Sequence, residues 1–106
     1  MIIRRVPLLA LITLMMVTAA AAEEWYEGGT LHKATAREWH AASYRNRLAT
    51  SADFIAAAKA AANLWELRER AVELERCITE GTDDPKLQDM KVSEVAAACI
   101  VLLGYG

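Results

Sequence analysis

The segment Leu64–Gly81, LWELRERAVELERCITEG, carries the clearest helical pattern in this chain of 106 residues. Its apolar residues recur at alternating steps of three and four, at Leu64, Leu67, Ala71, Leu74 and Ile78. These steps place the side chains on one narrow stripe of an α-helix, with charged residues on the remaining surface. Asn63 predicts the N-cap of this helix, and Gly81 predicts its C-terminal stop. We therefore expect an amphipathic helix over residues 64–81.

Three further helices are expected around this one. Thr35-Ala-Arg-Glu38 has the form of a capping box and predicts a helix from residue 36 to about residue 47. Thr50-Ser-Ala-Asp53 predicts a second start, with a helix that runs to about residue 62. The last helix should end at Leu103, and residues 95–103 carry no polar side chain, which predicts that they form the buried centre of the fold. The expected fold class is all-α, a small bundle of about four short helices.

Cys77 and Cys99 are the two cysteines of the chain. In an oxidising compartment a disulfide between them is favoured over two free buried thiols, and the bond needs α-carbons within about 7 Å. If one unbroken helix began at Pro85, Cys99 would lie ~21 Å from the turn while Cys77 lies only ~6 Å from it. The disulfide therefore predicts a connection over residues 81–91, with a short turn at 85–88 and a last helix that starts near Val92. A steep crossing of the two helices is the alternative.

The N-terminus predicts a cleavable signal peptide over residues 1–22. Arg4 and Arg5 form a positive region, an apolar run follows, and Ala20-Ala21-Ala22 offers a cleavage site. The apolar run has about 12 residues, whereas a bilayer span takes about 20, so cleavage is favoured over an uncleaved anchor. We expect a periplasmic or secreted protein. Its mature part, residues 23–106, would be a single small helical domain with an irregular N-terminal arm over residues 23–34.

The charge of the mature chain limits its partners. Without Arg4 and Arg5, ten Lys/Arg remain against fourteen Asp/Glu, which gives a net charge of about −4. An acidic exported chain is not expected to bind nucleic acid. The apolar stretch of residues 95–103 is too short to span a membrane, so the mature protein is not expected to be membrane-spanning.

The N-terminal third of the mature chain concentrates aromatic and basic side chains. Such side chains dominate the energetics of binding surfaces. The candidate binding face consists of Trp25, Tyr26, Arg37, Trp39, His40, Tyr44, Arg45 and Arg47. The alternative is that Trp39 docks its helix on the core and that the charges are merely solvated. The expected partner is another protein or an anionic component of the envelope.

Catalytic and metal-binding residues are not predicted. His32 and His40 would lie ~12 Å apart on a helix, too far for one metal ion. Ser43 and Ser51 lie on no recognisable nucleophile elbow. The sequence therefore predicts no catalytic residue, no metal site and no cofactor, and a protein that is not an enzyme.

Two short segments resemble known families. Thr50-Ser-Ala-Asp-Phe-Ile55 resembles the start of the second conserved region of the HdeA-type periplasmic acid-stress chaperones, and Ala97-Ala-Cys99 resembles the segment around their second cysteine. Ser51 stands where that family has its first cysteine, so the disulfide topology would differ. The C-terminal helix that ends in Leu-Leu-Gly-Tyr105 is similar to that of small secreted immunity proteins. The HdeA-type resemblance implies an alternative function, an acid-triggered holdase that exposes its apolar last helix as its carboxylates are neutralised.

Overall fold

The structure is a computed structural model that describes residues 23–106, and the predicted signal peptide, residues 1–22, lies outside the described residues. The described part is helical, and its β-pairing is limited to one isolated bridge between Thr35 and Lys91. None of the described helices is both long enough and apolar enough to cross a bilayer. The elements are α2 (Ala36–Ala41), α3 (Tyr44–Ala57), α4 (Leu64–Gly81), the 3-10 helix η2 (Pro85–Leu87) and α5 (Val92–Leu102). The predicted small all-α bundle is confirmed.

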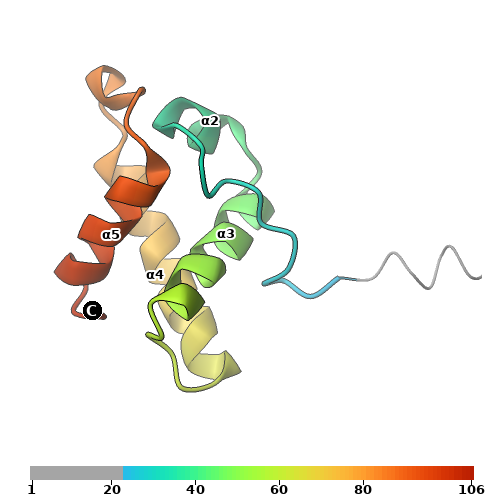
Figure 1. The fold of residues 1–106 in the computed structure, drawn as a ribbon. Helices are drawn as coiled ribbons and strands as arrows, with labels where there is room; N and C mark the ends of the chain where they lie inside the picture. Colours follow the sequence, from blue (N-terminus) through green and yellow to red (C-terminus); the bar gives the residue numbers. More distant parts are fainter. Residues whose placement is uncertain (1–22) are drawn as a thin grey trace, which may run out of the picture.

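Helix α4 is the centre of the bundle, with α3 packed along one side and α5 along the other (Figure 1). Its bounds are those predicted from the apolar stripe, and the Asn63 side chain caps it by accepting a hydrogen bond from the Glu66 amide. Ala71, Leu74 and Ile78 of the stripe are fully buried. The helix thus supplies the surface on which its two neighbours assemble.

The boundary between the first two helices differs from the prediction. Helix α2 ends at Ala41, and α3 begins at Tyr44 behind an N-cap at Ser43, whose hydroxyl accepts from the Asn46 amide. Thr50 and Ser51, predicted to lie at a helix start, are instead buried inside α3. The Ser51 hydroxyl donates to the Arg47 carbonyl one turn earlier, 2.8 Å away. Its hydrogen bond is therefore made inside the helix, and Ser51 does not cap a helix start.

The end of α3 also differs from the prediction, at Ala57 rather than near residue 62. Lys59 has a φ of +54°, in the left-handed region that ends many helices. The Ala60 amide donates to the Ile55 carbonyl at 3.0 Å, so the chain reverses here in a Schellman-type turn. The residues that follow form the link to α4.

The connection between α4 and α5 has the predicted form. Helix α4 ends at Gly81, η2 forms a short turn at Pro85–Leu87, and α5 starts at Val92. This break allows α5 to run back along α4, and Cys77 and Cys99 form a disulfide with their Cα atoms 6.0 Å apart. The predicted disulfide is confirmed.

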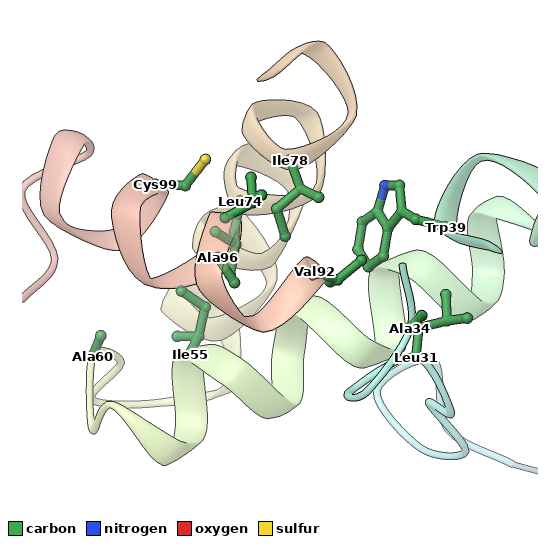
Figure 2. Packing of buried hydrophobic residues seen from close by; sticks show 11 residues of the cluster. Leu31, Ala34, Trp39, Ile55, Ala60, Leu74, Ile78, Val92, Ala96 and Cys99 are labelled. Atoms are coloured by element: carbon green, nitrogen blue, oxygen red, sulfur yellow. The ribbon is translucent and has the colours of Figure 1, made fainter. Parts of the chain in front are cut away.

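The main core lies where α2, α3, α4 and α5 converge (Figure 2). Trp39 of α2 packs there with residues of the other three helices, among them Ile55, Leu74 and Val92. The expected burial of all residues 95–103 is wrong, because Val101 and Leu102 are 70% and 80% exposed. One face of α5 meets α4 and α3, and no described segment covers its other face.

The N-terminal arm, residues 23–34, has no helix and is packed along α3. Leu31 and Ala34 join the main core. Gly29 presses against α3 so closely that an added Cβ would lie 2.6 Å from the Thr50 amide nitrogen. Only glycine fits this contact, which brings the aromatic residues of the arm onto the helices.

Candidate functional site

The structure does not bring the residues of the predicted aromatic–basic face together on one surface. Trp39 is the first of them. Its side chain is fully buried in the main core, and its indole Nε1 donates to the Thr79 hydroxyl at 3.0 Å. The assignment of Trp39 to a binding face is therefore wrong. Trp39 docks α2 on the core, which is the alternative that the sequence left open.

Arg47 is likewise internal rather than part of a surface. Its guanidinium donates to the Glu75 carboxylate at 2.9 Å and to the Ala42 carbonyl at 2.7 Å. The Arg47 and Glu75 side chains are only 18% and 9% exposed. Thr79 donates to the same Glu75 oxygen, so Trp39, Thr79, Glu75 and Arg47 form one hydrogen-bonded chain that we call the polar chain. The polar chain ties α2, α3 and α4 together.

The two histidines contact neighbouring polar side chains and do not form a common site. The Thr82 hydroxyl gives its one hydrogen to the Ile78 carbonyl, so it accepts from Nε2 of the half-buried His40, 2.9 Å away. His32 Nε2 lies 2.7 Å from the Asp53 carboxylate. Within residues 23–106, no three His, Cys, Asp or Glu side chains are grouped so that they could hold a metal ion.

Arg37, Tyr44 and Arg45 are the members of the predicted face that remain exposed. Arg37 pairs with the exposed Asp89 at 3.0 Å, and exposed ion pairs of this kind contribute little to stability. These three side chains lie on α2 and the first turn of α3, apart from the buried Trp39.

Trp25 and Tyr26 lie on the N-terminal arm rather than on α2 or α3. Their rings meet edge to face at 5.4 Å and pack on a small second core of Leu48, Ala52 and Ala71. The guanidinium of Arg68 lies 4.9 Å from the centre of the Trp25 ring. Sequence reasoning missed Arg68, because only the fold brings it to an aromatic residue far away in the chain.

The first turn of α4 exposes two large apolar side chains. Trp65 is 77% exposed and Leu64 is 59% exposed. Leu64 was expected on the buried stripe, but α3 ends at Ala57, and among residues 23–106 Leu64 stays exposed. Arg68 follows Trp65 by three residues and therefore lies beside it on the helix surface. We call Trp25, Leu64, Trp65 and Arg68 the tryptophan surface.

A groove lies on the α5 side of α4. It has a volume of about 470 Å³ and is lined by Glu73, Arg76, Cys77, Glu80, Gly81 and Leu103. Beside it, the Tyr105 hydroxyl donates to the Glu73 carboxylate, and the Arg70 guanidinium lies 4.6 Å from the Tyr105 ring centre. Burial and the hydrogen bond to Glu73 raise the pKa of Tyr105 to about 12.

Comparison with known proteins identifies no relative of this chain. No protein-family model, no curated protein and no solved structure matches the chain. The function therefore has to be inferred from the two surfaces just described, the tryptophan surface and the groove.

Proposed function

We propose that the chain is a small exported binding protein, not an enzyme, that holds another protein through the tryptophan surface. The observation that carries this proposal is the exposure of Trp65. This residue is 77% exposed and follows the exposed Leu64 in the chain. A tryptophan offers a large contact area with few rotatable bonds, and exposed apolar clusters commonly mark sites of protein association.

The residues near Trp65 are already held in position before a partner binds. Arg68 is held over the Trp25 ring by a cation–π contact, so its guanidinium is already oriented before a partner arrives. Side chains that are fixed in advance lose less conformational entropy on binding. Trp25 packs on the second core with Tyr26 and contacts its ring edge to face, so its ring is also held in place.

Export is supported by the disulfide and by the predicted signal peptide. Disulfides form and persist in oxidising compartments, which include the periplasm and the exterior of the cell. Cys77 and Cys99 are joined in the described domain. We therefore propose that the protein acts in the periplasm or after secretion.

The test is capture of a partner by the immobilised mature protein, residues 23–106, from an envelope extract. Trp65→Ser combined with Arg68→Ala should lower capture about tenfold or more, because the double variant removes the centre of the surface. Arg37→Ala combined with Arg45→Ala is the matched control, since both side chains are exposed and lie elsewhere. Loss of capture in the control, with full capture by the Trp65 variant, would contradict the proposal. Capture of an anionic lipid or glycan in place of a protein would also contradict it.

An acid-stress holdase is the alternative function, and one observation favours it. The Glu75 carboxylate accepts hydrogen bonds from Arg47 and Thr79 at the junction of three helices, and loss of the largely buried pair with Arg47 would loosen this junction. Aggregation of a client protein at about pH 2–3 tests this alternative. A stable monomer that leaves the client to aggregate would exclude it.

A further inference from the structure

The groove between α4 and α5 has two unlike walls. Helix α4 contributes Glu73, Arg76 and Glu80, and Cys77 of the disulfide lies between them. On the other side lies Leu103, the C-cap residue of α5. One wall is therefore charged, the other is apolar, and a covalent bond fixes the distance between them.

The spacing of residues along α5 extends the apolar wall. Val95 lies next to Gly81, since a Cβ on that glycine would be 4.0 Å from Val95 Cγ1. Ala98 and Leu102 follow Val95 by three and seven residues, so they continue the same side of the helix. From this spacing we place Leu102, which is 80% exposed, at the rim of the groove, next to the lining residue Leu103. Val101 is turned by about 100° from Leu102 and lies on the side of α5 opposite Cys99.

The charges around the groove have a negative balance. Residues 95–106 contain no Asp, Glu, Lys or Arg. On the α4 wall, two carboxylates flank the single guanidinium of Arg76. Glu94 adds a further carboxylate one turn before Ala98, and the described chain as a whole is acidic. A partner that fits both walls must carry apolar and positively charged groups on adjacent sides.

We propose that the groove binds a cationic amphipathic α-helix of a partner protein. The apolar face of that helix would lie on Ala98, Leu102 and Leu103, and its Lys or Arg side chains would face Glu73 and Glu80. Glu73 and Gly81 are eight residues apart, which is ~12 Å along α4 and matches about two turns of a docked helix. This site is separate from the tryptophan surface and does not depend on it.

A designed peptide pair tests the chemistry of the occupant. The probe is a helix of about 14 residues made of Leu and Lys, with Leu at positions i, i+3, i+4 and i+7. Its controls are the same peptide with Glu in place of Lys and a scrambled peptide of the same composition. Calorimetric titration of the mature protein should show binding of the Lys peptide only, weakened by about tenfold at high salt. Equal binding of the Glu peptide or of the scrambled peptide would overturn the proposal.

Three single variants locate the site. Leu102→Ser should weaken binding of the Lys peptide about tenfold, whereas Val101→Ser, a similarly exposed position on the other side of α5, should leave it unchanged. Arg76→Ala should tighten binding severalfold, because it removes the positive charge that lines the groove. Weaker binding after Arg76→Ala, or equal effects of Leu102→Ser and Val101→Ser, would overturn the proposal.

The same titration separates this inference from the proposed function. All three substituted side chains are exposed, and circular dichroism with a free-thiol count verifies that each variant keeps its helices and its disulfide. Trp65→Ser should leave the affinity for the Lys peptide unchanged. Loss of peptide binding in that variant would mean that the peptide binds at the tryptophan surface, which contradicts the groove assignment alone.

Discussion

The two sides of α4 hold their neighbours by different means. On one side, the polar chain joins Trp39 of α2 and Arg47 of α3 to Thr79 and Glu75 of α4. On the other side, a disulfide and apolar contacts join α4 to α5. Figure 2 shows Trp39 at one edge of the core and Cys99 at the other.

The difference shows how a domain of this size obtains its stability. A chain of fewer than about 100 residues buries little apolar surface to spare, so additional links matter. The polar chain requires that every member be present, because each loss leaves a buried group without a partner. The disulfide depends on two residues alone, and it fixes the spacing of α4 and α5 on the side of α4 that carries the groove.

The largest effect is expected on the polar side, from Trp39→Ala. The substitution removes a fully buried indole and leaves the Thr79 hydroxyl without its donor, so it should cost about 4 kcal/mol of unfolding free energy. Urea unfolding followed by circular dichroism measures it. Trp39→Phe, which keeps most of the ring, is the control and should cost less. A loss below about 1 kcal/mol for the alanine variant would mean that α2 is not docked through this side chain.

The next effect is expected on the disulfide side. Replacing Cys77 and Cys99 together by alanine should lower the unfolding free energy by about 3 kcal/mol, because the unfolded chain gains the freedom of an open loop. Urea unfolding of the oxidised wild type gives the reference, and the reduced wild type should resemble the double variant. Equal stability of oxidised and reduced protein would show that the disulfide is not the main link on this side.

A smaller effect is expected from Glu75→Gln. The amide keeps the shape of the side chain but loses its charge, so its pairing with Arg47 should weaken by about 2 kcal/mol. Glu69→Gln on the exposed face of α4 is the matched control, with an expected change below about 0.5 kcal/mol. Similar changes in the two variants would place Glu75 in solvent rather than in the polar chain.

The smallest effect concerns Tyr105 beside the disulfide. Its pKa is raised from the usual 10.0 to about 12, so the folded state holds the phenol proton more tightly than the unfolded state does. The resulting stabilisation should be complete below about pH 10 and should disappear as the pH rises from about 10 to 12. Thermal unfolding over this range measures it, and Tyr105→Phe should remove this part of the pH dependence. An ultraviolet titration in which all three tyrosines titrate together near pH 10 would contradict the assignment.

The elements that the sequence predicted well are those with local signals or a covalent constraint. The stripe of Leu64–Gly81 predicted α4, and the requirement that Cys77 reach Cys99 predicted the break before Val92. The break at Ser43 was missed because Thr50 and Ser51 have the composition of a helix start. Their hydroxyls are in fact used inside α3 and against the arm.

The binding face was the least predictable part, for a physical reason. Aromatic and basic residues occur both in cores and on surfaces, so composition does not tell whether Trp39 or Trp65 is exposed. That distinction depends on where α3 ends relative to α4, which tertiary contacts decide. The contact of Arg68 with Trp25 joins residues 43 positions apart in the chain, so no local sequence pattern predicts it.

The single backbone bridge between Thr35 and Lys91 has a consequence for the order of folding. The α3–α4 and α4–α5 pairs each join neighbours in the chain, so their loops are short and they should close quickly. The bridge, with the bonds from Ala36 to Met90 and from Val92 to Ala34, joins segments more than fifty residues apart. We expect this closure to be the late step of folding, with α2 settling on a hairpin of helices that is already formed.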